Sequence, residues 1–176
     1  LAVHGYTHVD YSQLAQETQL NHLRLARELF ALAGITPVGF RSPYLSRNDP
    51  LYSAIEAAGF TYVSNQPVLW DVLDKASFTS SAAIGYERAL AFYETWHAAE
   101  SPSLPRLKGN LVEIPVSLPD DEILVERLNA PHNLIEETWQ GILSQTYQRG
   151  ELFTLQLHPE RIALCGESLS AVLAEA

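Results

Sequence analysis

Short β-rich runs alternate with amphipathic segments along the 176 residues, and this alternation constrains the fold more than any other feature of the chain. Apolar side chains recur at three- and four-residue spacing over 12–33, which predicts a helix with Ser12 as N-cap and Gly34 as its end. The stretch 134–149 predicts a second strong helix that ends at Gly150. β-rich runs between the helices predict strands at 1–4, 35–40, 60–64, 111–116 and 152–157.

Three more helical stretches complete the alternation. They are predicted over 50–58, 77–99 and 169–174, and 101–109 (SPSLPRLKG) is a proline-rich connector. Asn48 or Asp49 can cap the first of these helices, with Pro50 in its first turn. Strands that alternate with helices form a parallel sheet or a barrel with the helices outside. The sequence therefore predicts an α/β fold in a single domain over residues 1–176.

Composition limits the partners of this domain. Hydrophobic residues make up 47% of the chain and charged residues 18%, as in globular proteins. The net charge of −10 argues against nucleic-acid binding, which needs clustered lysine and arginine, and favours a neutral or cationic partner. No apolar stretch is long enough to form a membrane segment. The single cysteine, Cys165, excludes an intrachain disulfide and a thiolate zinc site, and we expect it to be a small buried apolar residue.

Residues able to bind a metal or transfer a proton follow the predicted strands, where an α/β fold places its active site. They are His4, His8, Arg41, Asp120, Asp121 and His158. Histidines four residues apart stack on one face of a helix and can share a zinc ion. Gly5 follows His4, so the glutamate of the His-Glu-x-x-His motif is not at its place.

Each of these residues also has a structural interpretation. His4 and His8 can be two surface histidines, and Arg41 a surface arginine before a turn. Asp120 and Asp121 follow a proline and can begin a helix, and His158 can cap one. Their joint position after strands, rather than any single motif, favours a catalytic site.

Three motifs in a fixed order resemble the polysaccharide deacetylase family, also known as the NodB-homology fold or carbohydrate esterase family four. They are HGYTH at 4–8, RSPY at 41–44 and LQLH at 155–158. The resemblance implies an irregular (β/α) barrel of fewer than eight strands. It also implies a divalent metal, expected to be Zn²⁺, held by His4, His8 and an aspartate.

In this family the aspartate ligand and the general base both come from a Thr-Phe-Asp-Asp type motif on the first barrel strand. No such motif occurs here, and the chain begins at Leu1 and contains no methionine. We therefore expect a domain that is incomplete at its N-terminus. We also expect the 176-residue chain by itself to be inactive.

The resemblance implies further roles. Arg41 orients the base, and the backbone N–H of Tyr44 stabilises the tetrahedral oxyanion. His158 is the general acid that protonates the leaving amine. Asp120 or Asp121 is its carboxylate partner, or else the residue that holds Arg41. The substrate contacts Pro43, Tyr44 and Leu157.

The sequence therefore predicts a metal-dependent hydrolase that removes N-acetyl groups from an amino-sugar polysaccharide or oligosaccharide. Two departures from the family pattern, Gln156 and Pro159 on either side of the LH pair, leave the acyl group and the substrate open. One alternative is a hydrolase of a small non-peptide amide on the same fold. Another is a non-catalytic carbohydrate-binding fragment. No segment of the chain indicates a cellular compartment.

Overall fold

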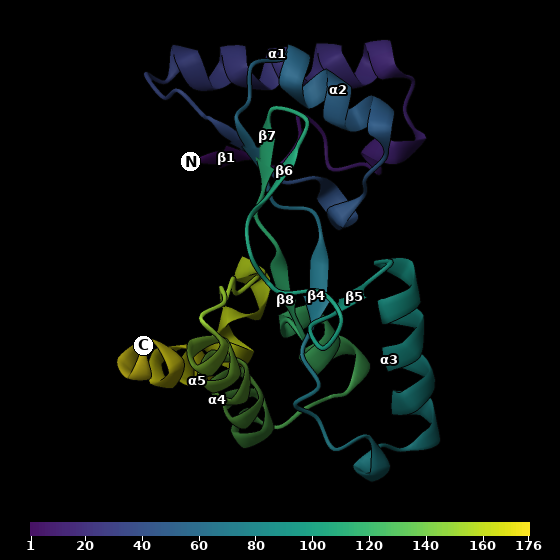
Figure 1. The fold of residues 1–176 in the computed structure, drawn as a ribbon, viewed down its shortest axis with the longest axis vertical. Helices are drawn as coiled ribbons and strands as arrows, with labels where there is room; N and C mark the ends of the chain where they lie inside the picture. Colours follow the sequence, from purple (N-terminus) through teal and green to yellow (C-terminus); the bar gives the residue numbers. More distant parts are fainter. The chain divides into compact units, whose positions relative to one another are not determined.

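A computed structural model describes all of residues 1–176, and Figure 1 shows its helices and strands. The strands are β1 (Ala2–Val3), β2 (Gly39–Phe40), β3 (Tyr62–Val63), β4 (Pro67–Leu69), β5 (Trp96–His97), β6 (Arg106–Lys108), β7 (Leu111–Glu113) and β8 (Val116–Leu118). The α-helices are α1 (Gln16–Leu32), α2 (Asp49–Ala57), α3 (Ser80–Phe92), α4 (His132–Arg149) and α5 (Ile162–Glu175). Turns of 3-10 helix lie at Tyr11–Gln13, Pro43–Leu45, Lys75–Ser77 and Pro159–Arg161, and a π-helical segment lies at Glu122–Arg127.

The chain packs into two compact units, and each is made of two separate stretches. The first unit contains Leu1–Gln66 and Pro105–Pro115, and the second contains Pro67–Leu104 and Val116–Ala176. The chain therefore passes from one unit to the other three times. Each unit has its own sheet and its own apolar core.

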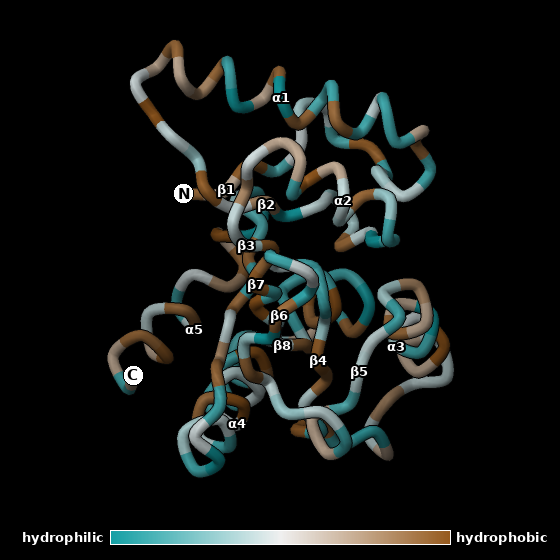
Figure 2. Tube along the Cα trace, turned by 45° about the horizontal axis from the view of Figure 1, so that its top comes forward, coloured by the Kyte–Doolittle hydropathy of each residue, from teal (hydrophilic) through white to brown (hydrophobic).

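The sheet of the first unit has the strand order β1-β2-β3-β7-β6. β1, β2, β3 and β7 are parallel, and β6 pairs antiparallel with β7 through a short hairpin. Parallel neighbours need a crossover, and α1 and α2 supply the first two. The two helices contact each other, as Figure 1 shows. Along α1 in Figure 2 hydrophilic and hydrophobic residues alternate, as expected of a helix with one buried face.

Tight packing between β2 and β3 depends on one glycine. Gly39 pairs with Tyr62 across the two strands. A Cβ at residue 39 would lie 2.0 Å from Cζ of the Tyr62 ring, so the ring occupies the space that any side chain would need. Val3, Phe40 and Val63, one from each of β1, β2 and β3, are fully buried in the core of this unit.

A buried carboxylate joins the ends of β3 and β7. Oε1 of Glu113 accepts the backbone N–H of Asn65 at 2.6 Å and that of Gln66 at 3.1 Å. Oε2 accepts the hydroxyl of Tyr52, on α2, at 2.7 Å. Three donors thus satisfy one buried charge, which is the usual condition for placing a carboxylate in a protein interior.

The second unit has a three-stranded parallel sheet with the order β5-β4-β8. Its core contains the fully buried side chains of Trp70, Tyr86, Leu118 and Trp139. The indole Nε1 of Trp139 donates to the carbonyl oxygen of Pro119 at 3.2 Å. This bond ties α4 to the segment that follows β8, and α4 also contacts α5.

The helix predictions are correct where the end signals are local. Asn48 caps α2 by accepting the N–H of Leu51 at 2.8 Å, and Gly150 ends α4 in a left-handed conformation with φ +65°. The prediction of Ser12 as the N-cap of the first helix is wrong. Asp10 accepts the N–H of Ser12 at 2.9 Å and caps a separate 3-10 turn, so α1 begins only at Gln16.

The strand predictions fail where tertiary pairing decides the outcome. The run 111–116 is not one strand, because residues 114 and 115 separate β7 and β8, which belong to different sheets. The stretch 152–157 is not a strand. Its backbone makes only isolated bonds, such as the N–H of Ser117 to the carbonyl of Thr154 at 3.0 Å. The strands β4, β5 and β6 were not predicted from the sequence.

The predicted α/β class with parallel strands is confirmed. The barrel, the single domain and the incomplete N-terminus stay predictions. None of the helices combines the length and the apolar character that crossing a bilayer requires.

Candidate active site

The two histidines of HGYTH lie close together in the loop that follows β1. The ring centroids of His4 and His8 are 5.2 Å apart and the rings are inclined by 67°. The two rings do not share a helix face, because the chain has no helix at 4–8 and bends at 6–9. The loop brings the rings together by a turn at Gly5, whose φ is +87°.

The orientation of His4 is fixed by a backbone carbonyl. Nδ1 of His4 lies 2.9 Å from the carbonyl oxygen of Arg41. A carbonyl only accepts hydrogen bonds, so Nδ1 carries the proton and Nε2 is the acceptor nitrogen of the neutral ring. This arrangement is typical of metal-binding histidines, whose second nitrogen donates to a carbonyl or carboxylate.

The RSPY segment lies beside the histidine loop. The guanidinium of Arg41 donates from Nε to the carbonyl of Ser64 at 3.0 Å and from Nη2 to the hydroxyl of Ser64 at 2.5 Å. The ring of Tyr44 lies 4.9 Å from that of His8. Tyr44 has φ +60°, an uncommon backbone conformation for a non-glycine residue, and Pro43 before it is buried.

Strand ends position these residues. Arg41 follows β2, and its backbone N–H donates to the carbonyl of Val3 in β1 at 2.9 Å. Ser64 and Asn65 follow β3, and Oδ1 of Asn65 accepts the N–H of Ser42 at 2.8 Å. Sequence reasoning missed Ser64 and Asn65, although their place directly after a strand is the same signal that marked Arg41.

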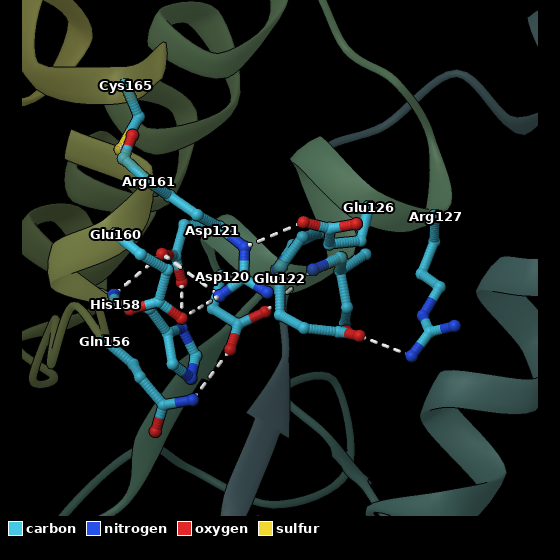
Figure 3. A network of polar contacts seen from close by, with 12 residues as sticks. Asp120, Asp121, Glu122, Glu126, Arg127, Gln156, His158, Glu160, Arg161 and Cys165 are labelled. Atoms are coloured by element: carbon cyan, nitrogen blue, oxygen red, sulfur yellow. Dashed lines mark hydrogen bonds and ion pairs between the residues drawn. The ribbon is translucent and has the colours of Figure 1, made fainter. Parts of the chain in front are cut away.

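In the second unit, Asp121 pairs with His158. Oδ1 of Asp121 lies 2.8 Å from Nδ1 of His158, and Oδ2 accepts the backbone N–H of His158 at 2.7 Å. Figure 3 shows this pair within a network of polar contacts. The hydrogen bond to Asp121 raises the pKa of His158, and burial of the ring opposes it only in part. Nδ1–H donates to the carboxylate, so Nε2 is the nitrogen that can exchange a proton with another molecule.

Asp120 faces a different partner. Its side chain is fully buried, Oδ2 accepts Nε2 of Gln156 at 2.7 Å, and Oδ1 accepts the N–H of Ile123 at 3.1 Å. Burial raises the pKa of Asp120 to about 6, with the neighbouring Asp121 adding to the effect. Of the two aspartates left open by the sequence, Asp121 is therefore the one that contacts His158.

The ligand atoms of Asp120, Asp121 and His158 lie within 4.8 Å of one another, a grouping that could hold a cation. In the structure Nδ1 of His158 is already engaged by Asp121, which favours a hydrogen-bonded pair over coordination through that nitrogen. Leu157, between Gln156 and His158, is half-buried against the core of the second unit.

The predicted site residues thus fall into two groups. The first unit holds His4, His8, Arg41, Pro43 and Tyr44, and the second unit holds Asp120, Asp121, Leu157 and His158. In the first group His4 and Arg41, which follow different strands, are in contact, and in the second group Asp121, shortly after β8, contacts His158. The expectation that both groups surround a single cation stays a prediction.

The family model of polysaccharide deacetylases matches residues 1–63. The resemblance to the polysaccharide deacetylases is confirmed. The deacetylase match contains His4, His8, Arg41 and Tyr44 and ends at β3. No curated protein matches the sequence.

Solved structures extend the likeness in fold. The crystal structure of a Mycobacterium smegmatis protein assigned to the polysaccharide deacetylases has 22% identity and a TM-score of 0.68, over 99% of this chain and 55% of that chain. This likeness shows the fold, and the chain spans about half the length of that protein.

Two other structures are more distant. One is a family 4 carbohydrate esterase from Streptomyces lividans in complex with acetate, with 26% identity and a TM-score of 0.35, over 90% of this chain and 66% of that chain. The other is the Xyl-CE4 domain of a xylanase from the hindgut metagenome of Trinervitermes trinervoides, with 15% identity and a TM-score of 0.36, over 88% and 60%.

Proposed function

We propose that the protein is a metal-dependent hydrolase that removes N-acetyl groups from an amino-sugar polysaccharide or oligosaccharide. One observation carries the proposal. Two imidazoles lie 5.2 Å apart inside the segment that matches the deacetylases, and the carbonyl of Arg41 fixes the tautomer of one of them.

The residues of the loop fit a divalent metal. Imidazole nitrogens are ligands that Zn²⁺ prefers, and a ligand histidine needs its other nitrogen held, as His4 has. The family resemblance implies an aspartate as a third ligand, from a Thr-Phe-Asp-Asp type motif that does not occur in residues 1–176. A metal bound there supplies a Lewis acid that polarises the amide carbonyl and acidifies a bound water.

His158 is proposed as the general acid. A raised pKa keeps a larger fraction of the imidazolium near neutral pH, and Asp121 holds it through Nδ1. The proton on Nε2 can then pass to the leaving amine nitrogen as the C–N bond breaks. Leu157 is proposed to contact the substrate beside this residue.

The RSPY segment is proposed to stabilise the oxyanion and to orient the base. The uncommon backbone conformation at Tyr44 supports a role for its N–H as an oxyanion donor, because such strain persists where a site needs it. Pro43 is proposed to contact the substrate. Arg41 is anchored by Ser64 and is proposed to orient the base carboxylate.

Metal binding and hydrolysis test the proposal separately. Zn²⁺ is titrated into the full natural protein and into its His4→Ala, His8→Ala and His132→Ala variants. We expect binding to be lost in the first two and retained in the third, because His132 begins α4, in the other unit. A natural protein that binds no Zn²⁺ would refute the metal-dependent mechanism.

Acetate release from N-acetylglucosamine oligomers is then measured with Zn²⁺ supplied, beside a panel of small amides and cyclic ureides. We expect release from the oligomers, and its loss in His158→Ala. Hydrolysis of the small amides alone would replace the sugar assignment with the small-amide alternative. Oligomer binding without hydrolysis of any substrate would favour a carbohydrate-binding module.

A further inference from the structure

A tyrosine hydroxyl lies at the centre of the histidine loop. Tyr11, in the 3-10 turn after the loop, is fully buried. Its Oη accepts the backbone N–H of Tyr6, midway between His4 and His8, at 2.8 Å. Hydrogen bonds from Tyr6 and Thr7 oppose the rise in the pKa of Tyr11 that burial causes. The polar end of this buried ring is thus turned toward the loop.

Gly5 completes the contact between the loop and this ring. A Cβ at residue 5 would lie 3.0 Å from Cε2 of Tyr11, 3.2 Å from its Oη and 2.8 Å from the carbonyl oxygen of Thr7. The loop can therefore close on the ring only with glycine at this place, where φ is +87°.

The other side of Tyr11 is anchored in the first unit. Its ring lies 5.6 Å from that of Phe40 in β2. Its carbonyl accepts Nε2 of Gln19 on α1 at 2.7 Å, and Gln19 is itself buried. Tyr11 thus joins the loop to a strand and a helix of the first unit. A phenylalanine would fill the same core space, so the hydroxyl needs a separate explanation.

We propose that Tyr11 is a positioning residue that holds the His4–His8 loop in its metal-binding conformation through the hydrogen bond from Tyr6 to its hydroxyl. The inference rests on the proposed function, in which the two imidazoles bind the metal. Groups that fix the orientation of a metal ligand change affinity by about 10- to 100-fold when they are removed.

The test compares two tyrosines of the same unit. Tyr11→Phe removes the hydroxyl and keeps the ring. Tyr52→Phe removes the hydroxyl of a half-buried tyrosine, which bonds to Glu113 and not to the histidine loop. Zn²⁺ affinity of the full natural protein is measured by competition with a chromophoric chelator. We expect an affinity about 10-fold lower in Tyr11→Phe and unchanged in Tyr52→Phe.

Hydrogen exchange of the Tyr6 amide in the metal-free protein gives a second readout. We expect exchange at least about 10-fold faster in Tyr11→Phe, while thermal unfolding changes to a similar extent in both variants. Unchanged Zn²⁺ affinity in Tyr11→Phe, or an equal loss in both variants, would overturn the inference. If the unsubstituted protein binds no Zn²⁺, the proposed function and the metal role of Tyr11 fail together, and the Tyr6 exchange rate still reports whether the hydroxyl holds the loop.

Discussion

Asp121 contacts His158 through both carboxylate oxygens, one at the ring nitrogen Nδ1 at 2.8 Å and one at the backbone N–H at 2.7 Å. The same carboxylate therefore sets the tautomer of the imidazole and the course of the backbone that carries it. Because Asp121 is fully buried, water screens the interaction little.

Asp121→Asn is expected to lower the pKa of His158. The hydrogen bond to the Asp121 carboxylate is the largest cause of the raised pKa, and an amide removes its charge. The pKa is measured from the pH dependence of the His158 ring resonances in NMR spectra. Asp74→Asn, which alters a carboxylate that caps an exposed turn of the same unit, is the control and should leave the titration unchanged. An unshifted His158 in Asp121→Asn would contradict the assigned pairing.

Asp120→Asn is expected to change how stability depends on pH. Burial raises the pKa of Asp120 from 3.8 to about 6 in the folded protein. The stability that this group contributes is therefore fully present below pH 3.8 and is lost as pH rises toward and through 6. A shift of this size corresponds to about 3 kcal/mol, at 1.36 kcal/mol per pKa unit.

The asparagine does not titrate, so the free energy of unfolding of the variant, minus that of the unsubstituted protein, should increase between about pH 4 and pH 7. Urea unfolding at several pH values measures this difference. Comparing pH values cancels any constant cost of the lost carboxylate. A difference that stays flat across this range would show that Asp120 ionises normally in the folded state.

Gly39→Ala is expected to destabilise the first unit by about 3 kcal/mol, because the new methyl group overlaps the Tyr62 ring. Gly34→Ala is the matched control, since a Cβ there meets nothing within 4 Å and only its φ of +73° opposes the change, at about 1 kcal/mol. The double variant Gly39→Ala/Tyr62→Ala should be more stable than the sum of the single changes predicts. Strict additivity in chemical unfolding would argue against this packing.

Glu113→Ala is expected to cost about 3 kcal/mol of unfolding free energy, because two buried backbone donors and the half-buried Tyr52 hydroxyl lose their acceptor. Tyr52→Phe removes one of the donors and should cost about 1 kcal/mol. Thermal and urea unfolding measure both variants. Equal costs would mean that the backbone donors of Asn65 and Gln66 find other partners.

Local signals explain which parts of the fold the sequence predicts well. α2 and α4 are marked by Asn48 and Gly150, which act within one turn of the helix that they end. The run 111–116 does carry a signal where it divides, because Pro115 has no N–H to donate to a strand ladder. Its apolar pattern nevertheless fits one strand, and the pairing of β7 with β3 and of β8 with β4 shows that it forms two.

The candidate site shows the same limit. His4, His8 and Arg41 follow β1 and β2 as predicted, whereas the run before His158 is not a strand in the structure. The spacing of His4 and His8 is that of one helix face, but the chain forms a loop there. The sequence does not tell which of Asp120 and Asp121 pairs with His158, because two adjacent aspartates differ only in where the fold directs their side chains. In the structure one faces Gln156 and the other faces His158, which lies 37 positions further along the chain. The proposed role of the Tyr11 hydroxyl has no signal in the sequence, because a buried tyrosine fits the same apolar pattern as a buried phenylalanine.

The three passages of the chain between the units have an evolutionary consequence. Residues 105–115, which complete the first sheet, are encoded between the two stretches of the second unit. A single crossover between genes therefore cannot exchange the unit that contains His4 and His8 for another. A premature stop before residue 105 would remove strands from both sheets at once. The two halves are inherited together.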